Sequence, residues 1–273
     1  MDPLINRRQL LRGSGALLLA AGVDGLAIEP RWLDVTSHEL PIASLPRELE
    51  GFTLAQITDA HLTSLSRVES AVLQRLQSTD AQLVVLTGDM IDCERHLVDL
   101  KHFCDALRKP GRRLVATLGN WEYWGKVPLD LLRRAYEDVG VNLLVNESLV
   151  LPEGLSVSAT DDFTAGSPDL HHVEPNRAAH ASILLTHSPQ LLDSIPELEH
   201  SFQLTLAGHT HGGQVRLSQH FAPVRPPGSG RFVSGWYDTR AGRAYVSRGT
   251  GTSIVAARFS CRPELPLFTF RQA

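Results

Sequence analysis

Short, almost wholly apolar segments recur along this chain, and each is followed at once by Asp, Asn or His. The clearest is "LVVLTGD", in which residues 83–87 form an unbroken run that is typical of a strand. A strand without polar alternation indicates a sheet that is covered on both faces. Segments with helical periodicity separate the first three runs, so the pattern predicts an α/β fold with parallel strands.

The expected order is strand and helix three times, then mostly strands. The first three strands are predicted in "FTLAQITD", "LVVLTGD" and "LVATLGN", and the three helices over 68–76, 94–107 and 129–139. Further strands are expected in "VNLLVNE", "LSVSATDD", "SILLTH", "FQLTLAGH", "GRAYVSRG" and "SIVAARFS". Ligands of such open sheets lie beyond the carboxyl ends of the strands.

Composition excludes some functional classes. The chain has 273 residues, with 26 Lys and Arg against 30 Asp and Glu, so the formal charge is −4. A nucleic-acid-binding protein usually has an excess of basic residues, so we expect no nucleic-acid partner. The three cysteines form no C-x-x-C pair, which argues against a zinc knuckle.

The N-terminus has the layout of an export signal. Arg7 and Arg8 precede an apolar run over 13–23, in the order of a twin-arginine leader. The run is shorter than the ~20 residues that span a bilayer, and Asp24 interrupts it. We therefore expect residues 1–30 to be a twin-arginine-like signal that places the protein in the periplasm or cell envelope. An uncleaved membrane anchor is the alternative.

The polar residues after the strands form a set of seven carboxylate, amide and imidazole groups. They are Asp59, His61, Asp89, Asn120, His187, His209 and His211. A single catalytic zinc takes three protein ligands, so this set indicates two divalent ions. Nitrogen and oxygen ligands without thiolate favour Mn, Fe, Zn or Co.

The ordered motifs "DAH", "GDMID", "GNWE", "THSP" and "GHTHGG" resemble those of the calcineurin-like metallophosphoesterase superfamily. The likeness extends from Thr53 to the C-terminus. It implies a four-layer α/β/β/α sandwich, in which helices flank two mixed sheets, formed by a single domain over 31–273. It also implies a metal-dependent phosphoesterase that hydrolyses a phosphodiester or phosphomonoester.

The resemblance implies roles for the seven residues. Asp59, His61, Asp89 and His211 would hold the first metal. Asp89 would bridge to the second, which Asn120, His187 and His209 would complete. A hydroxide between the two metals would be the nucleophile, with Asp89, Asn120 and His209 as the catalytic groups.

One position departs from the family pattern. The family usually has His after the Gly-Asn pair, and here Trp121 follows Asn120. Indole offers only an N–H donor and cannot transfer a proton as imidazole does. Trp121, Glu122 and Arg248 are candidate substrate contacts. Trp121 and Trp124 form either the wall of a pocket for an apolar substrate or part of the core.

Two alternatives to the ordinary phosphoesterase remain. One is a pyrophosphate hydrolase that acts on nucleotide-linked lipid precursors and associates with the membrane through the N-terminus. The other is a metal-binding scaffold whose catalysis is weakened because Trp121 replaces the usual His.

Overall fold

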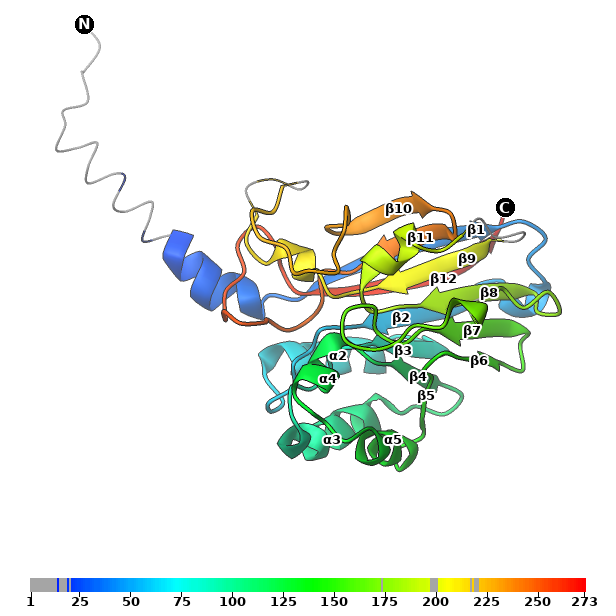
Figure 1. Ribbon diagram of the computed structural model, residues 1–273, viewed down its shortest axis with the longest axis horizontal. Coiled ribbons are helices and arrows are strands. Elements are labelled where there is room, and N and C mark those ends of the chain that lie inside the picture. Colours follow the sequence, from blue (N-terminus) through cyan, green and yellow to red (C-terminus); the bar gives the residue numbers. More distant parts are fainter. Residues whose placement is uncertain are drawn as a thin grey trace, which may run out of the picture.

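The computed structural model describes residues 14, 19, 21–172, 174–196, 201–216, 218 and 221–273. Its centre is a pair of six-stranded sheets packed face to face (Figure 1). The strands of the first sheet, in spatial order, are β1 (Asp34–Ile42), β12 (Glu264–Gln272), β2 (Thr53–Ile57), β3 (Leu83–Thr87), β4 (Arg113–Thr117) and β5 (Val141–Leu143). Those of the second sheet are β10 (Gly235–Thr239), β11 (Gly242–Val246), β9 (Phe202–Ala207), β8 (Ala181–Leu185), β7 (Leu155–Ala159) and β6 (Glu147–Val150).

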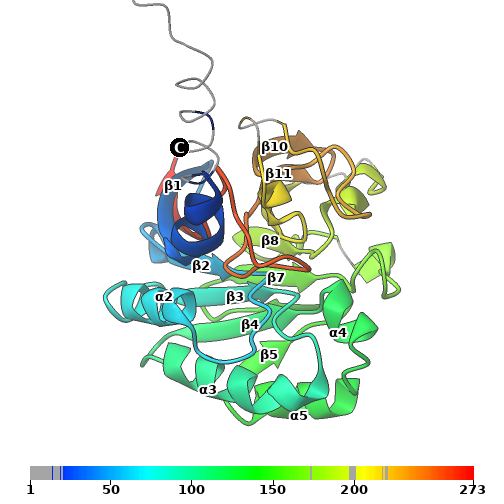
Figure 2. The ribbon, with the colours of Figure 1, turned by 90° about the vertical axis from the view of Figure 1, so that its left-hand side faces the viewer.

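Three α-helices cover the outer face of the first sheet, as Figure 2 shows: α2 (Arg67–Gln77), α3 (Leu97–Leu107) and α5 (Leu129–Glu137). The sequence fixes the start of α2, because the Ser66 hydroxyl accepts from the Val68 N–H and the Glu69 carboxylate accepts from the Ser66 N–H. The helices bury apolar side chains such as Val72 and Phe103 against the sheet.

The outer face of the second sheet is covered by a short 3-10 helix (Pro189–Asp193) and by loops. Leu192 and Phe232 pack there against apolar side chains of β8, β9 and β11. The structure confirms the predicted α/β class with two mixed sheets flanked by helices. Among the described residues, the helices that flank the second sheet are short.

Parallel pairing brings the polar residues to one edge. Strands β2, β3 and β4 are parallel neighbours, and so are β7, β8 and β9. Their carboxyl ends therefore lie side by side in each sheet. Strand β3 is wholly buried, as its apolar sequence predicts, and β8 is wholly buried as well.

Several segments differ from the sequence predictions: "VNLLVNE" is divided between β5 and the start of β6, and strands β10 and β12 were not predicted. "SIVAARFS" is not a strand: its contribution to the sheets is a single isolated bridge, between Val215 and Phe259. The buried Arg258 guanidinium donates instead to the Arg248 and Gly251 carbonyls, which holds this stretch as a loop. Conversely, the polar approach to the domain contains strand β1, which pairs in parallel with β12.

Most of the predicted leader lies outside the described residues. The described part ends in a π-helical turn (Asp24–Ile28) and a 3-10 turn (Glu29–Arg31). The Glu29 carboxylate accepts from the N–H groups of Ser260 and Cys261, at 2.7 and 2.6 Å, which fastens this segment to the domain. Among the described residues, no helix has the length and apolarity needed to cross a bilayer.

A short helix, α4 (Asn120–Trp124), follows β4 directly. The Glu122 carboxylate accepts from the Gly119 N–H at the start of this helix, at 3.0 Å. The turn therefore begins where the strand ends, and Asn120 is held at the edge of the sheet.

Candidate metal centre

The seven predicted residues converge at the shared edge of the two sheets. All seven side chains are buried, although they come from five loops that are distant in the sequence. Six of these residues form two groups of three, and within each group the potential ligand atoms all lie within 4.8 Å of one another. The first contains Asp59, His61 and His211, and the second contains Asp89, His187 and His209.

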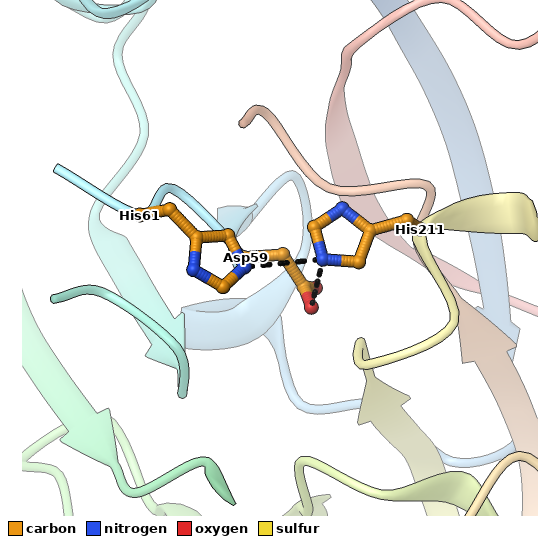
Figure 3. Close-up of side chains that lie close together, drawn as sticks. All are labelled: Asp59, His61 and His211. Atoms are coloured by element: carbon orange, nitrogen blue, oxygen red, sulfur yellow. Dashed lines mark hydrogen bonds and ion pairs between the residues drawn. The ribbon is translucent and has the colours of Figure 1, made fainter. Parts of the chain in front are cut away.

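Figure 3 shows the first group, in which the side chains of Asp59 and His61, from the loop after β2, and of His211, from the loop after β9, point toward one another. The Nε2 atoms of His61 and His211 are 3.1 Å apart. The His211 Nε2 atom lies 3.4 Å from Oδ1 of Asp59. Both Asp59 carboxylate oxygens also accept from the backbone N–H of His209, at 3.0 Å each, which ties the two loops together.

In the second group, Asn120 lies among the imidazoles. Its Oδ1 atom is 2.8 Å from Nδ1 of His209 and 3.2 Å from Nε2 of His187. Asp89 Oδ2 lies 3.1 Å from His187 Nε2 and 4.0 Å from His61 Nε2. Asp89 therefore lies between the two groups, where a bridging carboxylate is needed.

The outer ring nitrogens determine which atoms carry lone pairs toward the centre. Nδ1 of His187 donates to the Thr87 carbonyl at 2.8 Å, and Nε2 of His209 donates to the Pro227 carbonyl at 2.7 Å. In the neutral rings the facing atoms, which lie 3.3 Å apart, are therefore both acceptors. Acceptors at this separation repel unless a cation or a proton lies between them, so the set fits divalent metals.

The charges of the site agree with this interpretation. Burial and then the charge of His61 hold the pKa of His211 well below its usual range, so its imidazole is neutral. Burial and the charge of His187 likewise lower the pKa of His209. Neutral imidazole is the form that binds a metal. Moreover, Nδ1 of His211 is buried and has no hydrogen-bond partner among the described residues.

Two histidines beside carboxylates behave in the opposite way. Burial disfavours the charged form of His187, but the Asp89 charge and hydrogen bond outweigh it and raise the pKa well above its ordinary value. Burial also lowers the pKa of His61, but the hydrogen bond to Asp92 and the charge of Asp89 outweigh this effect, and the pKa is raised. A divalent cation held by His187 and Asp89 would take the place of the proton that the raised pKa of His187 favours.

Five of the seven residues have a backbone conformation that is unusual for side chains with a Cβ atom. Their φ angles lie between +46° and +68°, for Asp59, His61, Asp89, His209 and His211. Each such residue carries a conformational cost that the surrounding structure must offset, and such residues cluster at functional sites. An unfavourable φ angle at one of these residues could have a purely local cause. Unfavourable φ angles at five of them indicate that the fold stabilises this arrangement of side chains as a whole.

Two glycines allow the loops to approach each other. A Cβ atom on Gly88 would lie 2.6 Å from both the Gly119 nitrogen and Nδ1 of His187. One on Gly119 would lie 2.3 Å from Oδ1 of Asp89. The glycines in "GD" and "GN" are therefore needed for close packing beside Asp89.

Glu122 lies beneath the centre and supports it. Its buried carboxylate accepts from the N–H groups of Asp89, Met90 and Gly119, at 2.7 to 3.1 Å. Burial and the charge of Asp89 raise the pKa of Glu122 to about 7, against the opposing backbone hydrogen bonds. This placement does not match the predicted substrate contact, because the carboxylate is occupied by the backbone of the Asp89 loop.

Arg248 is also engaged elsewhere. Its guanidinium lies 2.7 Å from Asp34 and 3.1 Å from Glu264. Arg248 lines one pocket, and Asp89 and Asn120 line another. Two carboxylates hold the Arg248 side chain in this arrangement, and its predicted role as a substrate contact stays a prediction.

The two indoles form a pocket wall. A pocket of about 490 Å³ is lined by Trp121 and Trp124 together with Asp89, Asn120 and His211. The indole rings are 5.6 Å apart in an edge-to-face arrangement, and Trp124 is 52% exposed. The Trp121 ring also lies 5.7 Å from the ring of His61. Of the two interpretations of these tryptophans, the pocket wall is the one that fits.

One side chain that orients a predicted ligand was not predicted from the sequence. Nδ1 of His61 lies 2.6 Å from Oδ1 of Asp92. Asp92 was visible at the end of "GDMID", three residues after Asp89. Spacing alone could not identify it, because the contact depends on how the loop after β3 folds toward β2.

Comparisons with known proteins agree with this geometry. Residues 52–213 match the family described as calcineurin-like phosphoesterase. The metallophosphoesterase YkuE of Bacillus subtilis is 30% identical over 98% of both chains. The phosphodiesterase YaeI of Escherichia coli is 25% identical over 97% of this chain and 98% of its own length. A transmembrane protein with a metallophosphoesterase domain from Danio rerio is 27% identical over 94% of this chain and 61% of its own length.

The family match covers more than half of the chain, and it contains all seven of the predicted ligand positions, from Asp59 to His211. This is the region in which acidic and imidazole side chains form two groups able to hold divalent metals. The chain therefore belongs to the calcineurin-like phosphoesterase family, whose members are metal-dependent phosphoric ester hydrolases.

Proposed function

We propose that the protein hydrolyses phosphodiesters at a dinuclear metal centre. Asp59, His61 and His211 would hold one cation, and Asn120, His187 and His209 the other, with Asp89 shared. The observation that carries this proposal is the position of Asp89, whose Oδ2 atom lies 3.1 Å from His187 in one group and 4.0 Å from His61 in the other. When bound, two divalent cations lower the pKa of a coordinated water and neutralise charge on a phosphoryl group.

The residues of this chain supply position and shape. Asp92 and the Thr87 and Pro227 carbonyls fix the rings of His61, His187 and His209, so that one lone pair of each faces the centre. The backbone N–H of Trp121 donates to Asp89 Oδ1 at 2.8 Å, which orients that carboxylate. Fixed groups of this kind avoid reorganisation during phosphoryl transfer.

The presence of Trp121 favours a substrate with a good leaving group, such as a diester, over a monoester whose leaving group is poor. A His at this position could protonate a departing alkoxide, whereas indole cannot. Esters with acidic leaving groups need less protonation, so they suit a site without this group. The name of the relative YaeI, a phosphodiesterase, supports the same choice.

Metal removal tests the proposal directly. Protein stripped with a chelator should lose hydrolysis of bis-p-nitrophenyl phosphate, and added Mn²⁺ should restore it. Metal analysis of the active protein should find two ions per chain. Asp89→Asn should lose both properties, while Asp105→Asn should keep them because Asp105 is an exposed residue of α3. Full activity in the stripped protein would contradict the proposal, and two bound ions without turnover would favour the scaffold alternative.

We also propose that the protein functions in the cell envelope, on the basis of Arg7, Arg8 and the apolar run that follows. Fractionation of cells that express the full chain checks this. An Arg7→Lys, Arg8→Lys variant should accumulate in the cytoplasm if a twin-arginine route is used. Recovery of the parent in the cytoplasmic fraction would contradict this localisation, and equal distribution of parent and variant would contradict the twin-arginine route.

A further inference from the structure

The pocket at the candidate metal centre has two chemically different ends. Asp89, Asn120, His209 and His211 form its polar end. Most of the remaining wall is apolar, and its larger members are Trp121, Trp124, Val215, Val224, Ile254 and Val255. A volume of about 490 Å³ with mostly apolar walls and a few polar groups is typical of a small-molecule site.

The apolar wall is not explained by packing. Ile254 is 93% exposed, Val224 is 75% exposed and Val255 is 57% exposed. None of the three belongs to the buried clusters of the described residues. Single exposed aliphatic side chains are ordinary, but several around one opening indicate a binding surface.

The rim that carries Ile254 and Val255 is held in place. The Ser253 N–H donates to Oε1 of Gln214 at 2.7 Å, and the Gln214 amide donates to the Ser253 carbonyl at 3.1 Å. Further along, the Arg258 N–H donates to the Gly25 carbonyl at 2.9 Å. A surface that is fixed before binding costs less entropy when a ligand binds.

We propose that the substrate is an amphipathic phosphate ester with a long alkyl chain. Its phosphate lies at Asp89 and His209, and its chain lies along Trp121, Trp124 and Ile254. This inference rests on the proposed function, because the phosphate is placed by the metal centre. A sugar or nucleoside in the same position would leave its hydrogen-bonding groups unpaired against the apolar wall, which is unfavourable.

A pair of synthetic diesters separates chain recognition from chemistry. p-Nitrophenyl methyl phosphate and p-nitrophenyl octyl phosphate share one leaving group and one charge, so they differ only in the chain. With Mn²⁺-loaded enzyme and the octyl ester below its micelle concentration, kcat/KM should be at least about tenfold higher for the octyl ester. Burial of only a few methylene groups suffices for this ratio.

Variants locate the effect at the rim. The double variant Ile254→Ser, Val255→Ser should bring the octyl-to-methyl ratio close to one. The matched control is Val98→Ser, which replaces a valine that is 60% exposed on α3, outside the pocket, and should keep the ratio of the parent. A ratio near one in the parent, or an unchanged ratio in the double variant, would overturn the inference.

A binding measurement keeps the inference testable without turnover. Octylphosphonate should shift the tryptophan emission of the parent to shorter wavelength, because the chain removes water from Trp121 and Trp124, and methylphosphonate should not. If neither diester is hydrolysed, the proposed function fails while this shift still tests the pocket. If both are hydrolysed equally and the emission is unchanged, the metal chemistry stands and the alkyl-chain inference fails.

Discussion

The Asp92 carboxylate holds the His61 imidazole through a contact of 2.6 Å between Oδ1 and Nδ1. This contact places the proton on Nδ1 and leaves Nε2 facing His211 and Asp89, at 3.1 and 4.0 Å. His61 also has a φ angle of +46°, so its backbone conformation is itself unfavourable. Asp92 therefore determines which ring atom is offered to the centre.

Removal of Asp92 tests this orienting role. Asp92→Ala should weaken Mn²⁺ affinity by roughly 10–100-fold, the usual effect of losing a partner of a ligating His. Asp92→Asn should recover part of the loss, because the amide oxygen can still accept from Nδ1. Calorimetric titration measures both. Asp80→Ala is the control, since Asp80 only pairs with Lys109 at the surface; equal affinities in all variants would contradict the role.

A pair of glycine substitutions tests the close packing beside Asp89. Both Gly88 and Gly111 have φ near +80°, but a Cβ atom on Gly111 would contact nothing within 4 Å. Gly111→Ala should therefore lower the free energy of unfolding by only about 1–2 kcal/mol, the cost of the left-handed conformation. Gly88→Ala adds a collision with Gly119 and His187 and should lower it by about 2–5 kcal/mol. Urea denaturation measures the difference, and equal losses would show that the approach is not tight.

Trp121→His tests whether the indole limits leaving-group assistance. With imidazole beside His61 and in the pocket, kcat for esters with poor leaving groups should rise by about 10²-fold, the lower end for general acid catalysis. Esters of p-nitrophenol should change little, so the dependence of rate on leaving-group pKa should become shallower. Trp124→His, on the same wall but without the contact to His61, should keep the steep dependence of the parent. Identical dependence in Trp121→His would reject this explanation.

Arg248 is predicted to act on stability and not on substrate binding. Burial alone would raise the pKa of Glu264, but the charge and hydrogen bonds of Arg248 outweigh it and lower the pKa. Arg248→Met should lower the free energy of unfolding at pH 7 by about 3–5 kcal/mol, because a buried carboxylate then lacks its partner. The KM of the folded fraction should stay unchanged.

The pH dependence of stability gives a second measurement of this ion pair. Since the folded pKa of Glu264 is depressed, the pair contributes stability above the unfolded pKa of about 4.5 and loses it as pH falls through the folded value. Thermal unfolding between pH 7 and pH 3 should therefore be less pH-dependent in Arg248→Met than in the parent. A parallel shift of both curves would contradict this assignment.

Local sequence determined the elements that position the site. The unbroken apolar run of β3 and the capping sequence before α2 act over a few residues, so they can be interpreted without the fold. The polar residue after each strand is equally local. Once the strands are parallel, these residues must meet at one edge, and this is why the seven side chains could be predicted together.

The tertiary structure decided the rest. The pairing of β1 with β12 joins segments more than 220 residues apart, and no periodicity in either segment specifies the partner. The contact of Asp92 with His61, the burial of Glu122 and the ion pairs of Arg248 likewise depend on which loops meet. Local propensity acts between neighbours in the chain, whereas partner choice depends on the burial and charge that only the assembled sheets create.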